Sequence, residues 1–208
     1  MFEENCYVLS DDSTKECVII DCGALYESEA DAIINYIKNE GLKPIHLLCT
    51  HGHLDHNFGN GAIYDAFGLK AEIHFEDEKM LKEINKQTKQ FFQVEYQCNT
   101  APIGKLLTSG KTINYGSQTL EVLPTPGHSR GSVTFYNRSQ EVAFTGDTLF
   151  RMRIGRTDLE GGDYETILSS LHLLATTLPP ETKIYPGHGP ISTIAEELDY
   201  NTYLTYKT

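Results

Sequence analysis

The chain has 208 residues, of which 39% are hydrophobic and 22% are charged, and its formal net charge is −12. These values are ordinary for a globular protein with one core, and they predict a single domain over residues 1–208. The acidic balance argues against nucleic acid as a partner, because phosphate binding needs clustered lysine and arginine. Repulsion of an anionic substrate would be offset by a bound divalent metal.

The first ten residues, MFEENCYVLS, lack a basic region and a long apolar run, so we expect no signal peptide. No apolar segment approaches the roughly 20 residues that span a bilayer, so we expect no membrane partner. The five cysteines include no CxxC pair, which argues against a disulfide framework or a thiolate zinc site. We therefore expect a cytoplasmic protein with reduced thiols.

The chain begins with strand and helix patterns in alternation. Apolar residues 5–10 and 15–21, joined by a polar turn, predict a hairpin. Residues 28–41 place alanine and isoleucines on one helical face, with Ser28 as the expected N-cap and Gly41 as the stop.

A buried strand is predicted for the continuous apolar run 44–50, which leads to a histidine-rich segment. Residues 61–68 are typical of a short helix, 70–74 of a strand, and 76–88 of a helix that runs from acidic to basic residues. Residues 89–110 look irregular.

The second half of the chain is dominated by strand patterns, followed by helices. Hairpins first, helices between strands, then hairpins again predict an α+β fold, an αββα sandwich of two mixed sheets with helices outside. The expected strands are 111–115, 118–125, 132–137, 141–146 and 183–187, and the expected helices are 163–178 and 193–204.

A histidine-rich segment, CTHGHLDHNFGNG, follows the predicted strand 44–50. His51, His53, Asp55 and His56 lie within six positions of one another. Alone, this pattern also fits a polar surface loop, because short motifs carry false positives. His51 and His53 alternate, so in an extended loop they point the same way. The simplest partition gives these two to one metal and Asp55 and His56 to another.

Three more metal-binding residue types follow predicted strands and lie beside glycine or proline. His128 follows LEVLPTPG, Asp147 follows VAFTG and His188 follows KIYPG. Strand ends place such side chains on loops held by a rigid scaffold. Seven candidate ligands are too many for one tetrahedral ion and suit two that share a bridge. Imidazole and carboxylate without thiolate favour zinc, iron or manganese.

The segments THGHLDH, PTPGHSRGS, FTGDTLF and YPGHG resemble, in order, the motifs of the metallo-β-lactamase superfamily. GDTLFRMRIGRTDLEGGD and PGHGPISTIAEE are closer still to short, single-domain glyoxalase II-like hydrolases, relatives of hydroxyacylglutathione hydrolase. The resemblance runs from about Asn5 to Tyr203.

This resemblance implies a role for each matching residue. One metal would be held by His51, His53 and His128, and the other by Asp55, His56 and His188, with Asp147 as the bridge. Asp55 and Asp147 would also take part in catalysis. Asp21 would support the metal loop by hydrogen bonding. We expect Arg156 and Asp158 to form an ion pair beside the site.

The implied reaction is hydrolysis of a small S-2-hydroxyacyl thioester by a metal-bound hydroxide. Two divalent ions about 3.5–4 Å apart, most simply zinc, lower the pKa of a shared water and stabilise the developing oxyanion. The thiolate is a good leaving group, so little help from a general acid is needed. Phe91, Phe92 and Tyr96 would line the substrate mouth, although they would equally well pin a long loop to the core.

Other activities stay open at this point. A mononuclear-iron persulfide dioxygenase of the same fold shares the GRTD segment and most of these ligands. A lactonase, another ester hydrolase or a metal-stabilised binding module would use the same residues.

The chain also departs from its relatives at both ends. We expect no C-terminal helical domain of the kind that binds glutathione in two-domain glyoxalase II enzymes, so the thiol of the substrate need not be glutathione. Such relatives carry a strand before the segment that matches FEENCYVL, and we expect this strand to be short or missing here. A second copy of the chain could cover that sheet edge as a homo-oligomer.

Overall fold

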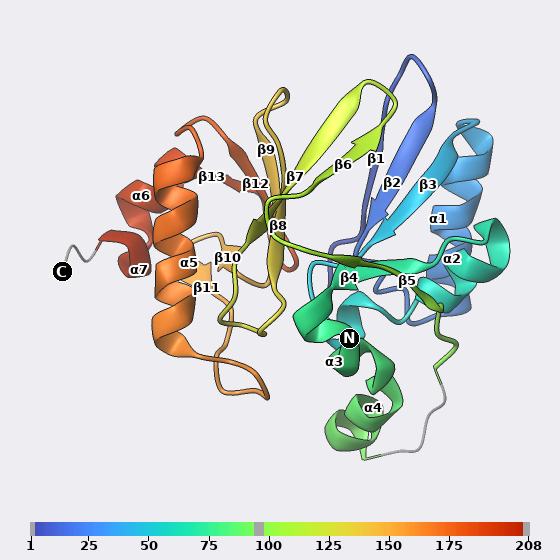
Figure 1. Ribbon diagram of the computed structural model, residues 1–208, viewed down its shortest axis with the longest axis horizontal. Coiled ribbons are helices and arrows are strands. Elements are labelled where there is room, and N and C mark those ends of the chain that lie inside the picture. The colour runs from blue at the N-terminus through green and yellow to red at the C-terminus, as the bar shows by residue number, and fades with distance from the viewer. Residues whose placement is uncertain (1–2, 94–97, 206–208) are drawn as a thin grey trace.

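Two β-sheets pack face to face between two layers of helices in this computed structural model, which describes residues 3–93 and 98–205 (Figure 1). The first sheet pairs its first two strands antiparallel and the others parallel. Its strands, in spatial order, are β1 (Tyr7–Ser10), β2 (Glu16–Ile20), β3 (Lys43–Leu48), β4 (Ala71–His74) and β5 (Ile103–Leu107).

The second sheet is antiparallel except for the β12–β9 pair. Its strands, in spatial order, are β13 (Ser192–Thr193), β12 (Lys183–Pro186), β9 (Val142–Gly146), β8 (Val133–Asn137), β7 (Gln118–Pro124) and β6 (Thr112–Tyr115). A short hairpin lies beside it, formed by β10 (Leu149–Phe150) and β11 (Arg153–Ile154).

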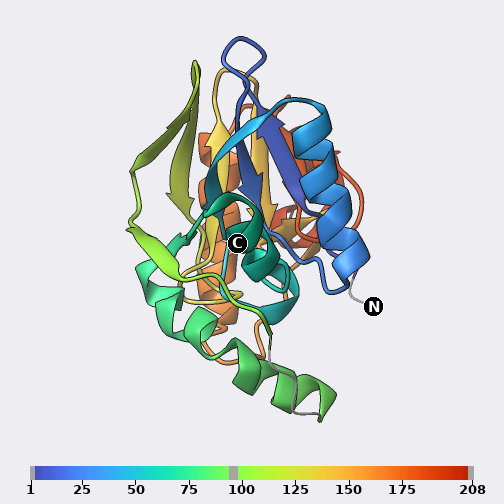
Figure 2. The same ribbon diagram turned by 90° about the vertical axis from the view of Figure 1, so that its right-hand side faces the viewer.

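Helices cover the outer face of each sheet (Figure 1). The first sheet carries α1 (Glu27–Asn39) and α2 (Asn60–Phe67), and the second carries α5 (Tyr164–Thr177), α6 (Ile194–Tyr200) and α7 (Thr202–Thr205). Figure 2 shows two further helices, α3 (Glu78–Lys82) and α4 (Ile84–Phe92), at the lower edge of the sheets. Two 3-10 turns are η1 (Leu54–His56) and η2 (Phe75–Asp77).

Strand β2 shows why the apolar runs in this chain are continuous rather than alternating. Val18 and Ile20 belong to the apolar cluster between the two sheets, whereas Ile19 belongs to the cluster under α1 and α2. All three are 0% exposed. A third cluster joins the second sheet to α5 and α6. Both faces of each sheet are therefore covered, as in parallel α/β sheets, and the predicted αββα sandwich is confirmed.

Two predicted segments differ from the observed structure. The helix expected at 76–88 breaks at Glu83, which ends α3 and precedes α4. The region 89–110 is not irregular throughout, because α4 continues to Phe92 and β5 pairs with β4. Strand β5 was missed because it is an edge strand in which Gly104, Lys105 and Leu106 are all exposed, so the alternation is lost.

The predicted start of α1 also shifts, whereas its end at Asn39, two residues before a left-handed Gly41, agrees with the predicted stop. The helix begins at Glu27 rather than after Ser28, because the Glu29 carboxylate accepts hydrogen bonds from the backbone N–H groups of Leu25 and Tyr26. The last helix, expected at 193–204, is interrupted at Asn201. Within residues 3–93 and 98–205, no helix is long and apolar enough to cross a membrane.

Asp11 joins the β1–β2 turn to the β6–β7 turn, and it gives a prediction for the pH dependence of folding. Its carboxylate is 4% exposed and accepts hydrogen bonds from the backbone N–H groups of Ser117, at 2.5 Å, and Ser13, at 3.0 Å. These bonds lower the pKa of Asp11 from 3.8 to about 2. Because the folded-state pKa is depressed, this stability is present above pH 3.8 and is lost as the pH falls towards about 2.

We therefore expect Asp11→Ala to lower the free energy of unfolding at neutral pH. Its difference from the wild type should shrink as the pH falls through that window, as measured by urea unfolding. Asp12 is an exposed carboxylate in the same turn, and Asp12→Ala should follow the wild type at every pH. A constant gap between Asp11→Ala and the wild type would contradict the assignment.

Candidate metal centre

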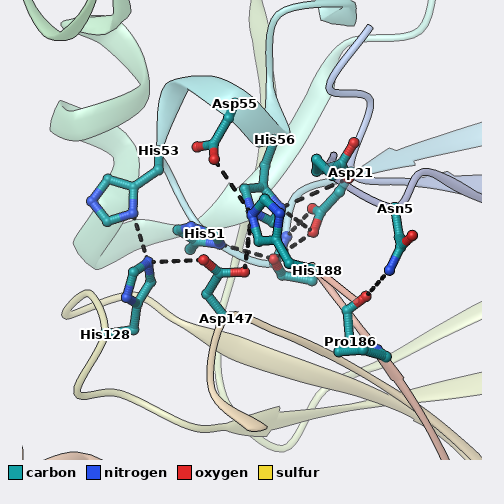
Figure 3. A network of polar contacts seen from close by, with 12 residues as sticks. Asn5, Asp21, His51, His53, Asp55, His56, His128, Asp147, Pro186 and His188 are labelled. Atoms are coloured by element: carbon teal, nitrogen blue, oxygen red, sulfur yellow. Dashed lines mark hydrogen bonds and ion pairs between the residues drawn. The ribbon is translucent and has the colours of Figure 1, made fainter. Parts of the chain in front are cut away.

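The candidate ligands come together at one edge of the sandwich, on four loops that follow strands (Figure 3). One loop follows β3 and continues into η1, and the others follow β7, β9 and β12. Gly127 shows how tightly one loop is packed, because a Cβ there would lie 2.3 Å from the Ile167 backbone nitrogen and its φ is +130°. The seven candidate ligands are His51, His53, Asp55, His56, His128, Asp147 and His188.

His51, His53 and His128 form the first group, and their candidate ligand atoms all lie within 4.8 Å of one another. The three side chains are 1%, 7% and 2% exposed. His53 Nδ1 lies 2.8 Å from His128 Nε2. Buried imidazole nitrogens that converge this closely could bind one metal ion together.

The rings of the first group are oriented by bonds on their outer sides. His128 Nδ1 lies 2.8 Å from the carbonyl oxygen of Arg156, which can only accept, so Nδ1 carries the proton and Nε2 faces inward with its lone pair. His51 Nδ1 lies 3.0 Å from Thr50 Oγ1. Within the described residues, the buried His51 Nε2 has no hydrogen-bond partner. These inward-facing nitrogens fit a bound metal ion.

Asp55, His56 and His188 form the second group, again within 4.8 Å of one another. His56 Nε2 lies 3.2 Å from His188 Nε2, and His188 Nε2 lies 3.4 Å from Asp55 Oδ2. His56 is 0% exposed. This group therefore combines two imidazoles with one carboxylate, a donor set that suits zinc, iron or manganese.

Asp147 lies between the two groups (Figure 3). Its Oδ1 is 3.2 Å from His56 Nε2 and 3.7 Å from His188 Nε2, whereas its Oδ2 is 3.5 Å from His128 Nε2. Gly187 leaves room for it, because a Cβ there would lie 2.3 Å from Asp147 Oδ1. One carboxylate thus presents one oxygen to each group, the geometry that a bridging ligand needs.

The two groups differ in their affinity for protons. Burial, with help from neighbouring histidines, lowers the pKa of His51 well below its usual value and lowers the pKa of His53 to about 3. Burial also opposes charge on His56, but Asp147 and Asp21 outweigh it and raise the pKa of His56. His51 and His53 therefore offer neutral imidazoles at neutral pH, whereas metal binding at His56 must displace a proton.

Asp147 itself stays ionised. Burial would raise the pKa of Asp147, but His56, His128 and His188 together hold it well below its usual value. A buried carboxylate surrounded by imidazoles is a strong ligand for a divalent ion.

Asp21 is fully engaged beside the second group. Its Oδ1 accepts the Thr50 backbone N–H at 2.7 Å, and its Oδ2 accepts the Thr50 hydroxyl at 2.6 Å and lies 2.9 Å from His56 Nδ1. Asp21 also forms a candidate ligand cluster with His51 and His56. Both Asp21 oxygens already have partners in Thr50 and His56. The geometry therefore fits the expected role of Asp21, support of the metal loop, better than direct ligation of a metal.

Arg156 and Asp158 form the expected ion pair, with two contacts of 2.7 Å. Both side chains are exposed, at 58% and 67%, so the pair contributes little to stability. The backbone carbonyl of Arg156 has the closer link to the site, through His128. Of the predicted substrate residues, Phe91 lines a cleft that reaches His53. The Phe92 side chain and Tyr96 lie outside the described residues.

Two residues beside the second group were missed from the sequence. Asn5 donates hydrogen bonds from Nδ2 to the carbonyl oxygens of Pro186 and Gly189, at 3.1 and 2.9 Å, and so holds the loop that carries His188 (Figure 3). Burial raises the pKa of Glu4 to about 9, and its Oε1 lies 3.9 Å from His56 Nδ1. Neither sits in a histidine motif, so the sequence carried no signal for them.

A sequence model of the metallo-beta-lactamase superfamily matches residues 2–188. The chain belongs to this superfamily. Among its curated relatives, it is 34% identical over 198 residues to the probable metallo-hydrolase YqgX of Bacillus subtilis, covering 95% of this chain and 90% of that protein. It is 35% identical over 207 residues to the hydroxyacylglutathione hydrolase GloC of Haemophilus influenzae, covering 100% of this chain and 95% of that protein.

Solved structures of the superfamily share the fold over nearly the whole chain. BLEG-1, described as a B3 metallo-beta-lactamase, is 38% identical with a TM-score of 0.88, covering 98% of this chain and 95% of that one. TTHA1623, described in a di-iron-bound form, is 31% identical with a TM-score of 0.83, covering 97% and 95%. ETHE1 from Myxococcus xanthus is 25% identical with a TM-score of 0.77, covering 99% and 81%.

Proposed function

We propose that the chain is a dinuclear-metal hydrolase that cleaves a small thioester of the S-2-hydroxyacyl type. The name of its GloC relative, hydroxyacylglutathione hydrolase, supports this substrate class. The donor chemistry suits zinc, and the di-iron form of TTHA1623 makes iron the first alternative. We further propose that it works in a reducing, cytoplasmic compartment, in keeping with its five free thiols.

The observation that carries the proposal is the position of Asp147 between the two ligand groups. Its two oxygens lie 3.2 Å from His56 Nε2 and 3.5 Å from His128 Nε2. We assign His51, His53 and His128 to the first ion, Asp55, His56 and His188 to the second, and Asp147 to both.

Two bound divalent ions would supply a nucleophilic water at neutral pH and would polarise the substrate carbonyl. The protein holds the imidazole rings in orientation through Thr50, Asp21 and the Arg156 carbonyl. Burial alone would raise the pKa of Asp55, but its hydrogen bond to His188 and the nearby His56 outweigh burial and lower the pKa below its usual value. Asp55 is therefore ionised and able to accept a proton from the attacking water.

A cleft of about 200 Å³ leads to this centre. His53 lies in its wall, so a substrate bound there would reach the first ligand group. Its apolar lining includes Met80, Phe91 and Leu159. Its charged lining mixes both signs, namely Lys79, Lys86 and Arg130 with Glu76, Asp77, Glu83 and Glu160. The apolar wall suits an acyl chain or thioester sulfur.

Phe91 provides a test of this cleft. We expect Phe91→Ala to raise KM about fivefold with little change in kcat, because losing roughly 1 kcal/mol of apolar contact weakens ground-state and transition-state binding alike. Phe75 is similarly exposed, at 48% against 40%, but does not line the cleft. Phe75→Ala should leave both constants unchanged, and equal effects of the two substitutions would argue against this cleft as the substrate site.

The proposed function is tested by assaying metal-replete protein on S-2-hydroxyacyl thioesters of several thiols. We expect release of free thiol with kcat/KM on the order of 10⁴ M⁻¹s⁻¹ or higher, together with two metal equivalents per chain. Well under two equivalents, with every thioester left intact, would sink the proposal.

The alternative is a mononuclear-iron persulfide dioxygenase of the same fold. The iron in the TTHA1623 structure is the observation that favours it, although that structure holds two ions. An oxygen electrode with glutathione persulfide and iron-loaded protein separates the two activities. Oxygen uptake without thioester cleavage would support the dioxygenase, and a lactonase or other ester hydrolase would show neither.

A further inference from the structure

Asp77 is a buried carboxylate outside the seven candidate ligands, and its hydrogen bonds reach two of the ligand loops. It is 1% exposed and lies at the start of α3, but its side chain does not cap that helix. Asp77 Oδ2 accepts the Gly52 backbone N–H at 2.9 Å and the Ser129 hydroxyl at 2.6 Å. Asp77 Oδ1 accepts the Gly131 backbone N–H at 2.7 Å.

These three donors adjoin the ligands of the first group. Gly52 lies between His51 and His53 in the sequence, and Ser129 follows His128 directly. The two loops come from opposite sheets, one after β3 and the other after β7. The Val133 backbone N–H, at the start of β8, also donates a hydrogen bond to the carbonyl oxygen of Thr50 at 2.9 Å, next to His51. Asp77 therefore ties together the backbones on either side of the first group.

The chemistry of this contact calls for a carboxylate. All three partners are neutral donors, and no ion pair of Asp77 is found among the described residues. Burying a carboxylate without a cation is costly unless hydrogen bonds satisfy it, as they do here. An asparagine would turn its NH₂ group towards at least one backbone N–H, leaving two donors face to face.

Gly131 is matched to the same contact. A Cβ at this position would lie 2.6 Å from Asp77 Cγ and 2.7 Å from Asp77 Cβ, too close for any side chain. The backbone of the His128 loop thus approaches Asp77 only because residue 131 is glycine. Asp77 and Gly131, which are far apart in the sequence, therefore form one contact that connects the two ligand loops.

We propose that Asp77 is a positioning residue for the first metal ion, which sets the separation between the loop of His51 and His53 and the loop of His128. The inference rests on the proposed assignment of these three histidines to one ion. Asp77 does not touch the second group, so its effect should be confined to the first site.

The experiment measures zinc affinity by competition with a chelator in the His56→Ala background, which leaves the first group intact. We expect Asp77→Ala to weaken zinc binding at the first group about 10–100-fold. Asp77→Asn should weaken it by a smaller factor. Gly131→Ala, which displaces the same carboxylate, should reproduce the loss. In the His53→Ala background, which leaves the second group intact, Asp77→Ala should change the affinity less than about threefold.

Asp11→Ala is the matched control, because Asp11 is also a buried carboxylate that joins two turns, remote from the ligands. It should lower stability without changing zinc affinity. If Asp77→Ala does not fold, Asp77→Asn and Gly131→Ala carry the test. Unchanged first-site affinity in those variants, or equal losses at both sites, would overturn the inference. A parent protein that binds no metal would instead refute the proposed function.

Discussion

Asp147→Ala is expected to lower kcat for thioester hydrolysis about 10³-fold and to reduce metal binding at both sites. The Asp147 carboxylate presents one oxygen to His56 Nε2, at 3.2 Å, and the other to His128 Nε2, at 3.5 Å. Under the proposed assignment, its removal would take a ligand from each ion and would leave the surrounding histidines to repel one another. Losing roughly 4 kcal/mol of metal-derived transition-state stabilisation corresponds to about 10³-fold in rate.

The measurement is kcat at saturating substrate and added zinc, with circular dichroism to check the fold. Asp158→Ala is the control, because Asp158 is an exposed carboxylate beside the same site and its ion pair with Arg156 is at the surface. It should retain activity within about threefold of the wild type, since surface ion pairs contribute roughly 0–1 kcal/mol. An Asp147→Ala enzyme with a tenth or more of wild-type kcat would contradict the bridging role.

Single substitutions of His53 and His56 are expected to remove different metal ions. His53 lies with His51 and His128, whereas His56 lies with Asp55 and His188. Each ion would have three ligands of its own besides the shared Asp147. Losing one of the three should weaken the binding of that ion enough for it to be lost on dialysis. Each single variant should therefore retain about one metal per chain, and the double variant should retain none.

Metal content per chain, measured by mass spectrometry after dialysis, checks this prediction. His172 lies exposed on α5 and away from the ligand groups, and His172→Ala should keep both ions. If His53→Ala and His56→Ala each lose all bound metal, the ligands serve a single ion and the dioxygenase alternative moves ahead.

The ligand groups could be predicted because strand ends and histidine motifs both leave marks in the sequence. His128, Asp147 and His188 each follow an apolar run and lie beside glycine or proline, and the fold brings those strand ends to one edge. The αββα layers could likewise be predicted from the order of strand and helix patterns along the chain, and the burial of Val18, Ile19 and Ile20 on both faces of β2 agrees with them.

The supporting residues could not be predicted in the same way. Asp77 stands in an acidic segment at the start of a helix, where the helix dipole favours acidic residues. Its sequence context therefore fits a solvent-exposed helix end as well as a buried residue that connects two loops. The partners of Asn5 are backbone carbonyls more than 180 residues away. Such contacts depend on three-dimensional proximity and leave no local pattern.

The central claim, a pair of metal ions sharing Asp147, is tested most directly by anomalous diffraction from crystals of metal-replete protein at the zinc and iron edges. We predict two peaks per chain about 3.5–4 Å apart, one among His51, His53 and His128 and the other among Asp55, His56 and His188. A single peak among His51, His53, His128 and Asp147, with the second group free of metal at full loading, would contradict it.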